Sequence, residues 1–347
     1  MFGHDALRVG QGAMSRSSRQ RVVVITGASA GIGRATAIAF AGRGDRVALL
    51  ARGAAGLEGA RADVERAGGI GLPLPTDVAS AASVEAAAEA CEAELGPIDV
   101  WVNNAMATVF APVAATTAEE FRRATEVTYL GVVHGTMSAL RRMRPRDRGA
   151  IVQVGSALSY RGIPLQAAYC GAKRAIKGFT ESLRCELFHE SSGVRVSMVQ
   201  LPALNTPQFD WSRSKMPRQP QPVPPIFQPE VAAQAIVWSA DHGRREIHVG
   251  LPTVKAIVGE KVAPGLLDRY LGATGYDAQQ TDEPSAERDG NLFQPLDEDV
   301  DHGVHGRFDD RAKPASRMLW LSRHRQAMLA AGGAAAAGAA TLARRAR

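Results

Sequence analysis

Tyr169 and Lys173 are the pair whose residue types and spacing suggest chemistry most directly. They lie four residues apart at the start of a pattern that predicts a helix to about His189, so both side chains share one helix face. A phenol normally loses its proton near pH ~10, too high for acid–base work at neutrality. An ammonium one turn away favours the phenolate and is expected to lower the pKa of Tyr169. The pair predicts a general acid–base, although this spacing also arises by chance in many helices.

A glycine-rich turn near the N-terminus predicts a nucleotide site. Val22–Ile25 is an apolar, β-branched run typical of a buried parallel strand, and residues 26–33 read Thr-Gly-Ala-Ser-Ala-Gly-Ile-Gly before a helical pattern. In this context glycines allow a tight turn and the close approach of a pyrophosphate, to which the helix N-terminus presents free N–H groups. The alternative is a turn that simply requires glycine.

Polar residues follow several other predicted strands. Because parallel strands end at one sheet edge, where ligands of open α/β sheets bind, these residues are expected to meet there. The strands predicted at 46–50, 70–74, 98–102 and 150–154 are followed by Arg52, Thr76-Asp77-Val78, Asn103-Asn104-Ala105 and Ser156; further strands are expected at 195–201 and 247–249.

The end of the second strand bears on the choice of cofactor. A carboxylate there would bind the adenosine 2′-hydroxyl and select NAD, but the chain has Ala51 and then Arg52, whose guanidinium suits a 2′-phosphate. NADP(H) is therefore favoured over NAD(H), with Arg34 as a second candidate cation; the alternative for Arg52 is a solvated surface arginine. Asp77 is a candidate to accept from the adenine amino group or to cap a helix.

Composition sets the domain organisation. The 347 residues are 45% hydrophobic, which predicts one large α/β domain at 21–250 between a flexible N-terminus at 1–20 and a C-terminal extension at 251–347. The extension contains a helical pattern interrupted at Pro264, an acidic stretch at 277–311 expected to be extended or disordered, and a basic Ala/Gly-rich tail helix. For that tail, a surface-lying helix is favoured and weak membrane contact is the lesser alternative.

Charge and cysteine content narrow the partners and the compartment. The formal charge is +6, but no aromatic-interleaved basic stripe suggests nucleic-acid binding. The three cysteines form no CxxC pair, neither they nor the histidines show metal-ligand spacing, and residues 1–20 lack a secretory apolar core. A cytoplasmic protein without a metal site is expected.

Residues 202–229 form a long proline-rich segment that contains Phe209, Trp211 and Met216. Long irregular segments in compact domains are usually functional or disordered. The aromatic residues favour a substrate-covering lid over a simple linker, and an apolar substrate.

Taken together, the glycine-rich turn, Asp77-Val78, Asn103-Asn104-Ala105, Ser156, and Tyr169 with Lys173 closely resemble the short-chain dehydrogenase/reductase family over residues 20–250. The resemblance implies a doubly wound Rossmann fold with a parallel seven-stranded sheet, with cofactor and substrate in one domain. It also implies a homo-oligomer. Tyr169 would be the acid–base, Ser156 would stabilise the substrate oxygen, and Lys173 would hold the nicotinamide ribose and lower the tyrosine pKa. Motifs and resemblance together predict cofactor contacts from Gly27, Ser29, Gly31, Ile32, Gly33, Arg52, Asp77, Val78, Asn103, Ala105, Tyr169, Lys173 and Thr206.

Two departures from the family pattern stand out. Thr128 occupies the position of an asparagine that, in the family, supports a water relay to the lysine; the alternatives are that the relay is lost or that the threonine hydroxyl binds the water instead. Met106 and Ala203 replace glycines and are expected to narrow the pocket.

The predicted function is an NADP(H)-dependent oxidoreductase that interconverts a carbonyl and an alcohol on a small apolar molecule. The alternative is a non-catalytic NADP-binding sensor or scaffold that acts through the C-terminal extension.

Overall fold

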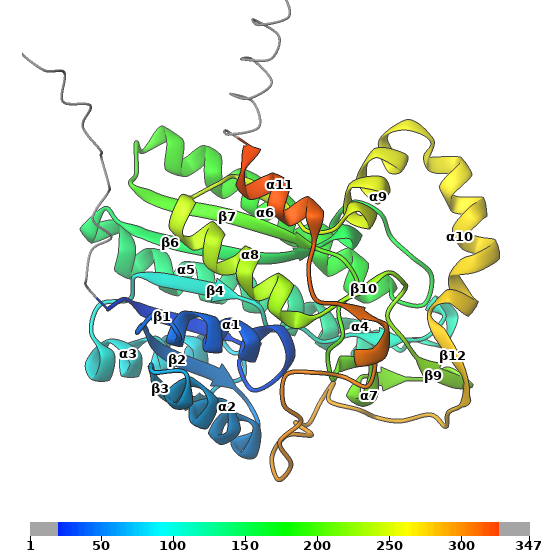
Figure 1. Cartoon of the computed structure of the whole chain (residues 1–347), viewed down its shortest axis with the longest axis horizontal. Coiled ribbons are helices and arrows are strands. Elements are labelled where there is room, and N and C mark those ends of the chain that lie inside the picture. The colour runs from blue at the N-terminus through cyan, green and yellow to red at the C-terminus, as the bar shows by residue number, and fades with distance from the viewer. Residues whose placement is uncertain (1–19, 326–347) are drawn as a thin grey trace, which may run out of the picture.

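A seven-stranded parallel sheet forms the centre of the computed structural model, which describes residues 20–325 (Figure 1). The order of its strands is β11-β7-β6-β4-β1-β2-β3, so the predicted doubly wound fold is confirmed. The direction of winding reverses between β1 and β4, and ligands of such sheets bind at the carboxyl ends beside that point. In chain order the strands are β1 (Val22–Thr26), β2 (Arg46–Ala51), β3 (Ile70–Pro75), β4 (Val100–Asn103), β6 (Gly149–Ser156), β7 (Val194–Leu201) and β11 (Glu246–His248).

Helices cover both faces of the sheet (Figure 1). One face packs against α1 (Gly31–Ala41), α2 (Ala54–Arg66) and α8 (Pro229–His242). The other face packs against α3 (Ala81–Leu95), α4 (Ala118–Thr125), α5 (Gly131–Met143) and α6 (Ala167–His189).

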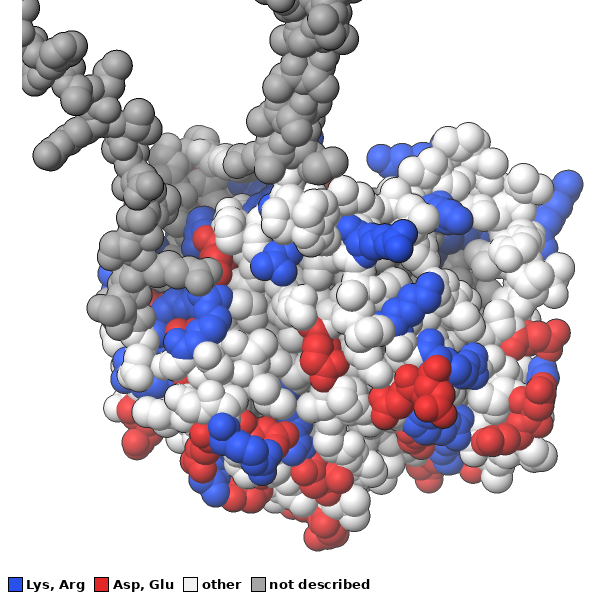
Figure 2. Space-filling model, in the orientation of Figure 1, with Lys and Arg blue, Asp and Glu red and all other residues white. Residues whose placement is uncertain are grey.

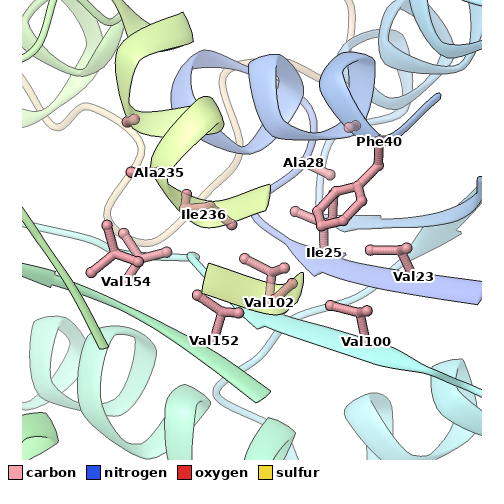
Figure 3. Packing of buried hydrophobic residues seen from close by; sticks show 14 of the residues in the cluster. Val23, Ile25, Ala28, Phe40, Val100, Val102, Val152, Val154, Ala235 and Ile236 are labelled. Atoms are coloured by element: carbon pink, nitrogen blue, oxygen red, sulfur yellow. The ribbon is translucent and has the colours of Figure 1, made fainter. Parts of the chain in front are cut away.

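The core explains why the strands read as continuous apolar runs. Successive side chains of a strand point to opposite faces, and helices cover both faces here, so both sets are buried. Figure 3 shows one set beneath α1 and α8, where Phe40 and Ile236 close over the sheet; its strand residues are Val23, Ile25, Val100, Val102, Val152 and Val154.

A capping box opens the helical run before β6. The Thr117 hydroxyl accepts from the Glu120 N–H at 3.1 Å, and the Glu120 carboxylate accepts from the Thr117 N–H at 2.8 Å. The run continues to Met143, but a π-helical turn at Glu126–Leu130 separates α4 from α5. Such turns occur frequently at functional sites.

The segment predicted as a lid contains one short helix and three short strands and is not wholly irregular. It contains α7 (Gln208–Trp211), β8 (Arg213–Ser214), β9 (Arg218–Pro220) and β10 (Ile226–Phe227), and β8 pairs with β5 (Val109–Phe110). Phe209 and Met216 are buried here with Phe110 and Leu165.

The C-terminal extension returns to the α/β domain. Helices α9 (Leu251–Val262) and α10 (Pro264–Ala278) form an arm at one end of the molecule (Figure 1). The acidic stretch that follows is extended and packed: β12 (Gln280–Pro284) pairs with β9. Directly after this stretch, β13 (Ala312–Lys313) pairs with β10. The last described helix is α11 (Arg317–Arg323); the N-terminal segment 1–19 and the predicted tail helix lie outside the described residues.

In Figure 2, acidic and basic side chains mix over the lower half of the face, and scattered basic side chains lie over the upper half; they form no continuous basic stripe on that face. Within residues 20–325, no helix has the length and apolar character needed to cross a bilayer.

Candidate active site and cofactor site

A cavity of about 430 Å³ lies at the carboxyl ends of the strands. It brings together residues from the glycine-rich turn, from the ends of β2, β3, β4 and β6, and from α6, as the sequence predicts. The predicted residues that line it are Gly27, Ser29, Gly31, Ile32, Arg52, Asp77, Val78, Ala105, Ser156, Tyr169, Lys173 and Thr206.

Ser156, Tyr169 and Lys173 converge at one point of this cavity. Ser156 ends β6, and its hydroxyl lies near enough to the Tyr169 phenol to act on the pKa of that phenol; Tyr169 is one turn before Lys173 on α6. Lys173 is 3% exposed; its Nζ donates to the carbonyl of Val154 at 2.7 Å and lies 5.5 Å from the centre of the Tyr169 ring. A proton donor, a hydroxyl and an amine are thus held together beside open space.

The pKa of Tyr169 runs against the expectation from sequence. Burial raises this pKa above its usual range, and the hydrogen bond with Ser156 offsets only part of the rise. Burial also lowers the pKa of Lys173 to about 7, so the amine carries less charge with which to favour a phenolate. The predicted lowering of the tyrosine pKa is therefore not found here, because the helix spacing says nothing about loss of water around either group.

The glycine-rich turn has the shape of an anion cradle. Gly27 and Gly31 have φ values of +65° and +54°, which favour glycine, and a Cβ on Gly27 would lie 2.9 Å from Cα of Ala105. No side chain caps the N-terminus of α1, and its first residues, Gly31 and Ile32, line the cavity beside Thr206. These features fit the pyrophosphate of a dinucleotide.

Charged groups surround the far end of the cavity, where β2 and β3 end. Asp77 accepts from the Ala79 N–H at 3.0 Å and from the Arg123 guanidinium at 2.7 Å; burial would raise its pKa, but these partners hold it below its usual value. Ser80, rather than Asp77, caps α3. Arg52 lies beside them, whereas Arg34 does not line the cavity and pairs with Asp63 and Asp301.

Two predicted cofactor contacts do not reach the cavity. Asn103 is buried among Trp101, Thr136 and Gln153, and its neighbour Asn104 lines the cavity instead. Asn103 is still part of β4, so its side chain points into the layer beneath the sheet. Gly33 serves the packing of α1, because a Cβ there would lie 2.0 Å from the carbonyl oxygen of Gly27.

The family departures have clear places in the structure. The Thr128 hydroxyl donates to the carbonyl of Ala107 and accepts from its N–H, both at 2.9 Å, so its proton is not free for a water relay. Met106 and Ala203 both line the cavity, as expected for residues that narrow it.

The lid and the extension complete the walls. Phe209 and Trp211 line the cavity, but Met216 does not. Sequence reasoning missed the contribution of the extension: α10 supplies residues such as Leu271, and the acidic stretch supplies Asn291 and Asp297. The low apolar content of the acidic stretch had favoured an extended or disordered segment, and so gave no signal that it would pack against the cavity.

Within residues 20–325, no cysteine or histidine lines the cavity. The Cys170 thiol approaches the carbonyl of Ile163 at 4.0 Å and does not line the cavity. Residues 20–325 contain no cluster of three or more His, Cys, Asp or Glu side chains that could hold a metal.

Comparisons with known proteins agree with this geometry. A family model described as short chain dehydrogenase matches residues 21–217. The "Uncharacterized oxidoreductase YxnA" of Bacillus subtilis (strain 168) is 30% identical over 315 residues, 90% of this chain and 87% of that protein. A match of that length has to reach into the C-terminal extension. Levodione reductase of Leifsonia aquatica is 33% identical over 58% of this chain and 76% of its own.

A solved structure agrees as well. The alcohol dehydrogenase of the archaeon Thermococcus sibiricus, complexed with 5-hydroxy-NADP, has a TM-score of 0.57 and 26% identity, and the match covers 67% of this chain and 96% of that one. With the fold, the cavity and these matches in agreement, the chain belongs to the short-chain dehydrogenase/reductase family and is an NAD(P)-dependent oxidoreductase acting on CH–OH groups.

Proposed function

We propose that this protein interconverts a carbonyl and an alcohol on a small apolar substrate, with NADP(H) as the favoured cofactor. The observation that supports this most directly is that Ser156, Tyr169 and Lys173 all line one cavity.

Each of the three residues has a distinct part. The Tyr169 phenol, whose pKa is raised by burial, donates its proton to the carbonyl oxygen during reduction and takes it back during oxidation. The Ser156 hydroxyl donates to the same oxygen and stabilises its developing charge. Lys173 binds the hydroxyls of the nicotinamide ribose through Nζ and carries positive charge to the tyrosine. The nicotinamide, when bound, supplies or accepts the hydride.

The lining of the cavity supports an apolar substrate. Met106, Ile163, Phe209, Trp211 and Leu271 all line it, so a long or bulky apolar group would be removed from water there.

The preference for NADP(H) rests on Arg52. Its side chain lines the cavity at the end of β2, where a cation suits the adenosine 2′-phosphate. Replacing Arg52 by Asp should shift the ratio of the dissociation constants toward NADH. An unchanged ratio would mean that Arg52 does not contact the phosphate.

We also propose that the protein is a cytoplasmic homo-oligomer. The exposed apolar side chains of Phe121 on α4 and Met137 on α5 support contact between copies.

The function is tested by NAD(P)H consumption with a panel of aldehydes, ketones, quinones and long-chain carbonyls. Turnover is expected with at least one apolar member and should fall by ~10²-fold or more in Tyr169→Phe, because the proton donor is lost. Tyr160→Phe is a matched control, since that phenol donates to Glu246 at 2.7 Å and does not line the cavity. Cofactor binding without turnover on any member would favour the sensor or scaffold alternative.

A further inference from the structure

Residues 291–303 of the C-terminal extension cross the dinucleotide end of the site; we name them the strap. In Figure 1 this segment is drawn in orange and passes beside α2. The carbonyl of Gly303 accepts from the Gly31 N–H at 3.1 Å, in the glycine-rich turn itself. The strap is therefore a neighbour of the cofactor site, although it lies far from that turn in the sequence.

The strap binds the donors that surround the end of β2. The Arg52 guanidinium donates to the carbonyl oxygens of Asn291 and Phe293. At the N-terminus of α2, the Ala55 N–H donates to the carbonyl of Glu298 and the Gly56 N–H donates to the carbonyl of Asp297, both at 3.0 Å. Donors that would otherwise attract an anion are thus partly satisfied by the strap.

Asp297 is the residue of the strap that brings a charge into the cavity. It is 7% exposed and lines the cavity next to Arg52 and Ser29. Among residues 20–325, none makes a hydrogen bond to its carboxylate. The carboxylate fits only because Gly53 and Gly56 lack side chains: a Cβ on either would lie 2.1 Å or 2.7 Å from one of its oxygens.

A buried carboxylate at this place has a definite chemical preference. It can accept hydrogen bonds from ribose hydroxyls, but it repels a phosphate group on the same ribose. Many dinucleotide-binding domains carry such an acid at the end of the second strand, where this chain has Ala51 and Arg52.

We infer that the strap is part of the cofactor site and that Asp297 is a specificity-determining residue, which accepts from the adenosine ribose and disfavours a 2′-phosphate. Arg52 and Asp297 then act in opposite directions, and the cofactor preference of the protein is the balance between them. This inference rests on the proposed use of a nicotinamide cofactor, which the same titrations test separately.

The test is a pair of binding titrations of the full chain, with NADPH and with NADH, followed by cofactor fluorescence. In Asp297→Asn the ratio of the two dissociation constants should move toward NADPH by about tenfold or more, because a like charge is removed from the phosphate. Asp299→Asn makes the same change of charge on an exposed strap residue that does not line the cavity, so its ratio should stay within about twofold of the wild type.

The outcomes separate the two levels of proposal. The role of Asp297 would be overturned if the ratio of the NADPH and NADH dissociation constants were the same in Asp297→Asn, Asp299→Asn and the wild type. Equal weakening of both cofactors in Asp297→Asn would also overturn it, because it would indicate a structural role only. Binding of neither cofactor by the wild-type chain would instead contradict the proposed function.

A measurement on the wild type keeps the inference testable if the variant does not fold. Amide hydrogen exchange of residues 291–303 should slow on addition of NADH, since the strap contacts the ribose. Unchanged exchange in the strap, together with slowed exchange in the glycine-rich turn, would show that the cofactor binds without the strap and would overturn the inference.

Discussion

Lys173 shows at the scale of one residue how burial and function are linked. Its amine is 3% exposed and has the carbonyl of Val154 as its partner. Burial lowers its pKa to about 7, far below the value of ~10.4 expected in an unfolded chain. Bound dinucleotide would bring hydroxyl groups to this amine, so cofactor and lysine charge are coupled.

The pKa of Lys173 predicts a pH-dependent stability. Between about pH 7 and pH 10 the unfolded chain holds a proton on this amine that the folded protein has lost. The free energy of unfolding therefore increases as pH rises through this range and is lowest at its acidic end, near pH 7. From pH 7 to pH 9 this contribution is at most ~2–3 kcal/mol, and it should vanish in Lys173→Met. Urea unfolding of both proteins at the two pH values, without cofactor, measures it.

Lys177→Met is the matched control for this prediction. Lys177 is one turn further along α6, and its amine pairs with Glu181 at the surface. In Lys177→Met the free energy of unfolding should rise between pH 7 and pH 9 by as much as it does in the wild type. Identical pH profiles for Lys173→Met and the wild type would contradict the assignment.

At the scale of elements, the start of α4 is tied to the lid segment by one carboxylate. Glu120 is 4% exposed, closes the capping box with Thr117, and pairs with Arg213 at 2.7 Å and Lys215 at 2.8 Å. Burial alone would raise its pKa, but Lys215, the Thr117 N–H and Arg213 lower it to about 2. The helix and the lid therefore depend on the same side chain.

Glu120→Gln should lower the free energy of unfolding by about 3 kcal/mol at pH 7, because two cations lose a buried partner. Chemical unfolding measures the loss. Because the folded-state pKa is depressed, the stabilisation by the carboxylate is complete above pH ~4.5 and is lost as pH falls toward 2. Glu119→Gln, exposed in the same turn, should change stability by less than ~0.5 kcal/mol; a similar loss in both variants would refute the role of the ion pairs.

At the scale of the whole molecule, the extension is part of the core rather than an appendage. Leu292 is fully buried among side chains that also pack α3, α4 and β4, and Leu319 on α11 joins the cluster on the opposite face of the sheet. The extension thus contributes both to stability and to the walls of the cavity.

Leu292→Ala should destabilise the whole protein by about 2–5 kcal/mol in a single unfolding transition, because it leaves a cavity in a shared core. Calorimetry and denaturant unfolding check this. Val300→Ala, on an exposed part of the strap, should be nearly neutral. A separate early transition of the extension, with the α/β domain unaffected, would show that the two do not share a core.

The sequence by itself determined the features that rest on local pattern. The β-branched run Val22–Ile25 forms a buried strand because helices cover both faces of the sheet. The conformation of the glycine-rich turn and the shared helix face of Tyr169 and Lys173 depend only on neighbouring residues in the sequence. Through the family that they resemble, these motifs also predicted the doubly wound sheet, and the cavity does bring Ser156, Tyr169 and Lys173 together.

Only the tertiary structure decided the features that depend on neighbours far along the chain. Whether Asn103 or Asn104 faces the cavity depends on where β4 ends, and the pKa of Tyr169 depends on the water removed by surrounding elements. The strap forms because carbonyls of an acidic stretch meet Arg52 and the start of α2, contacts that no local pattern records. Its carboxylate reaches the cofactor site because Gly53 and Gly56 leave room for it.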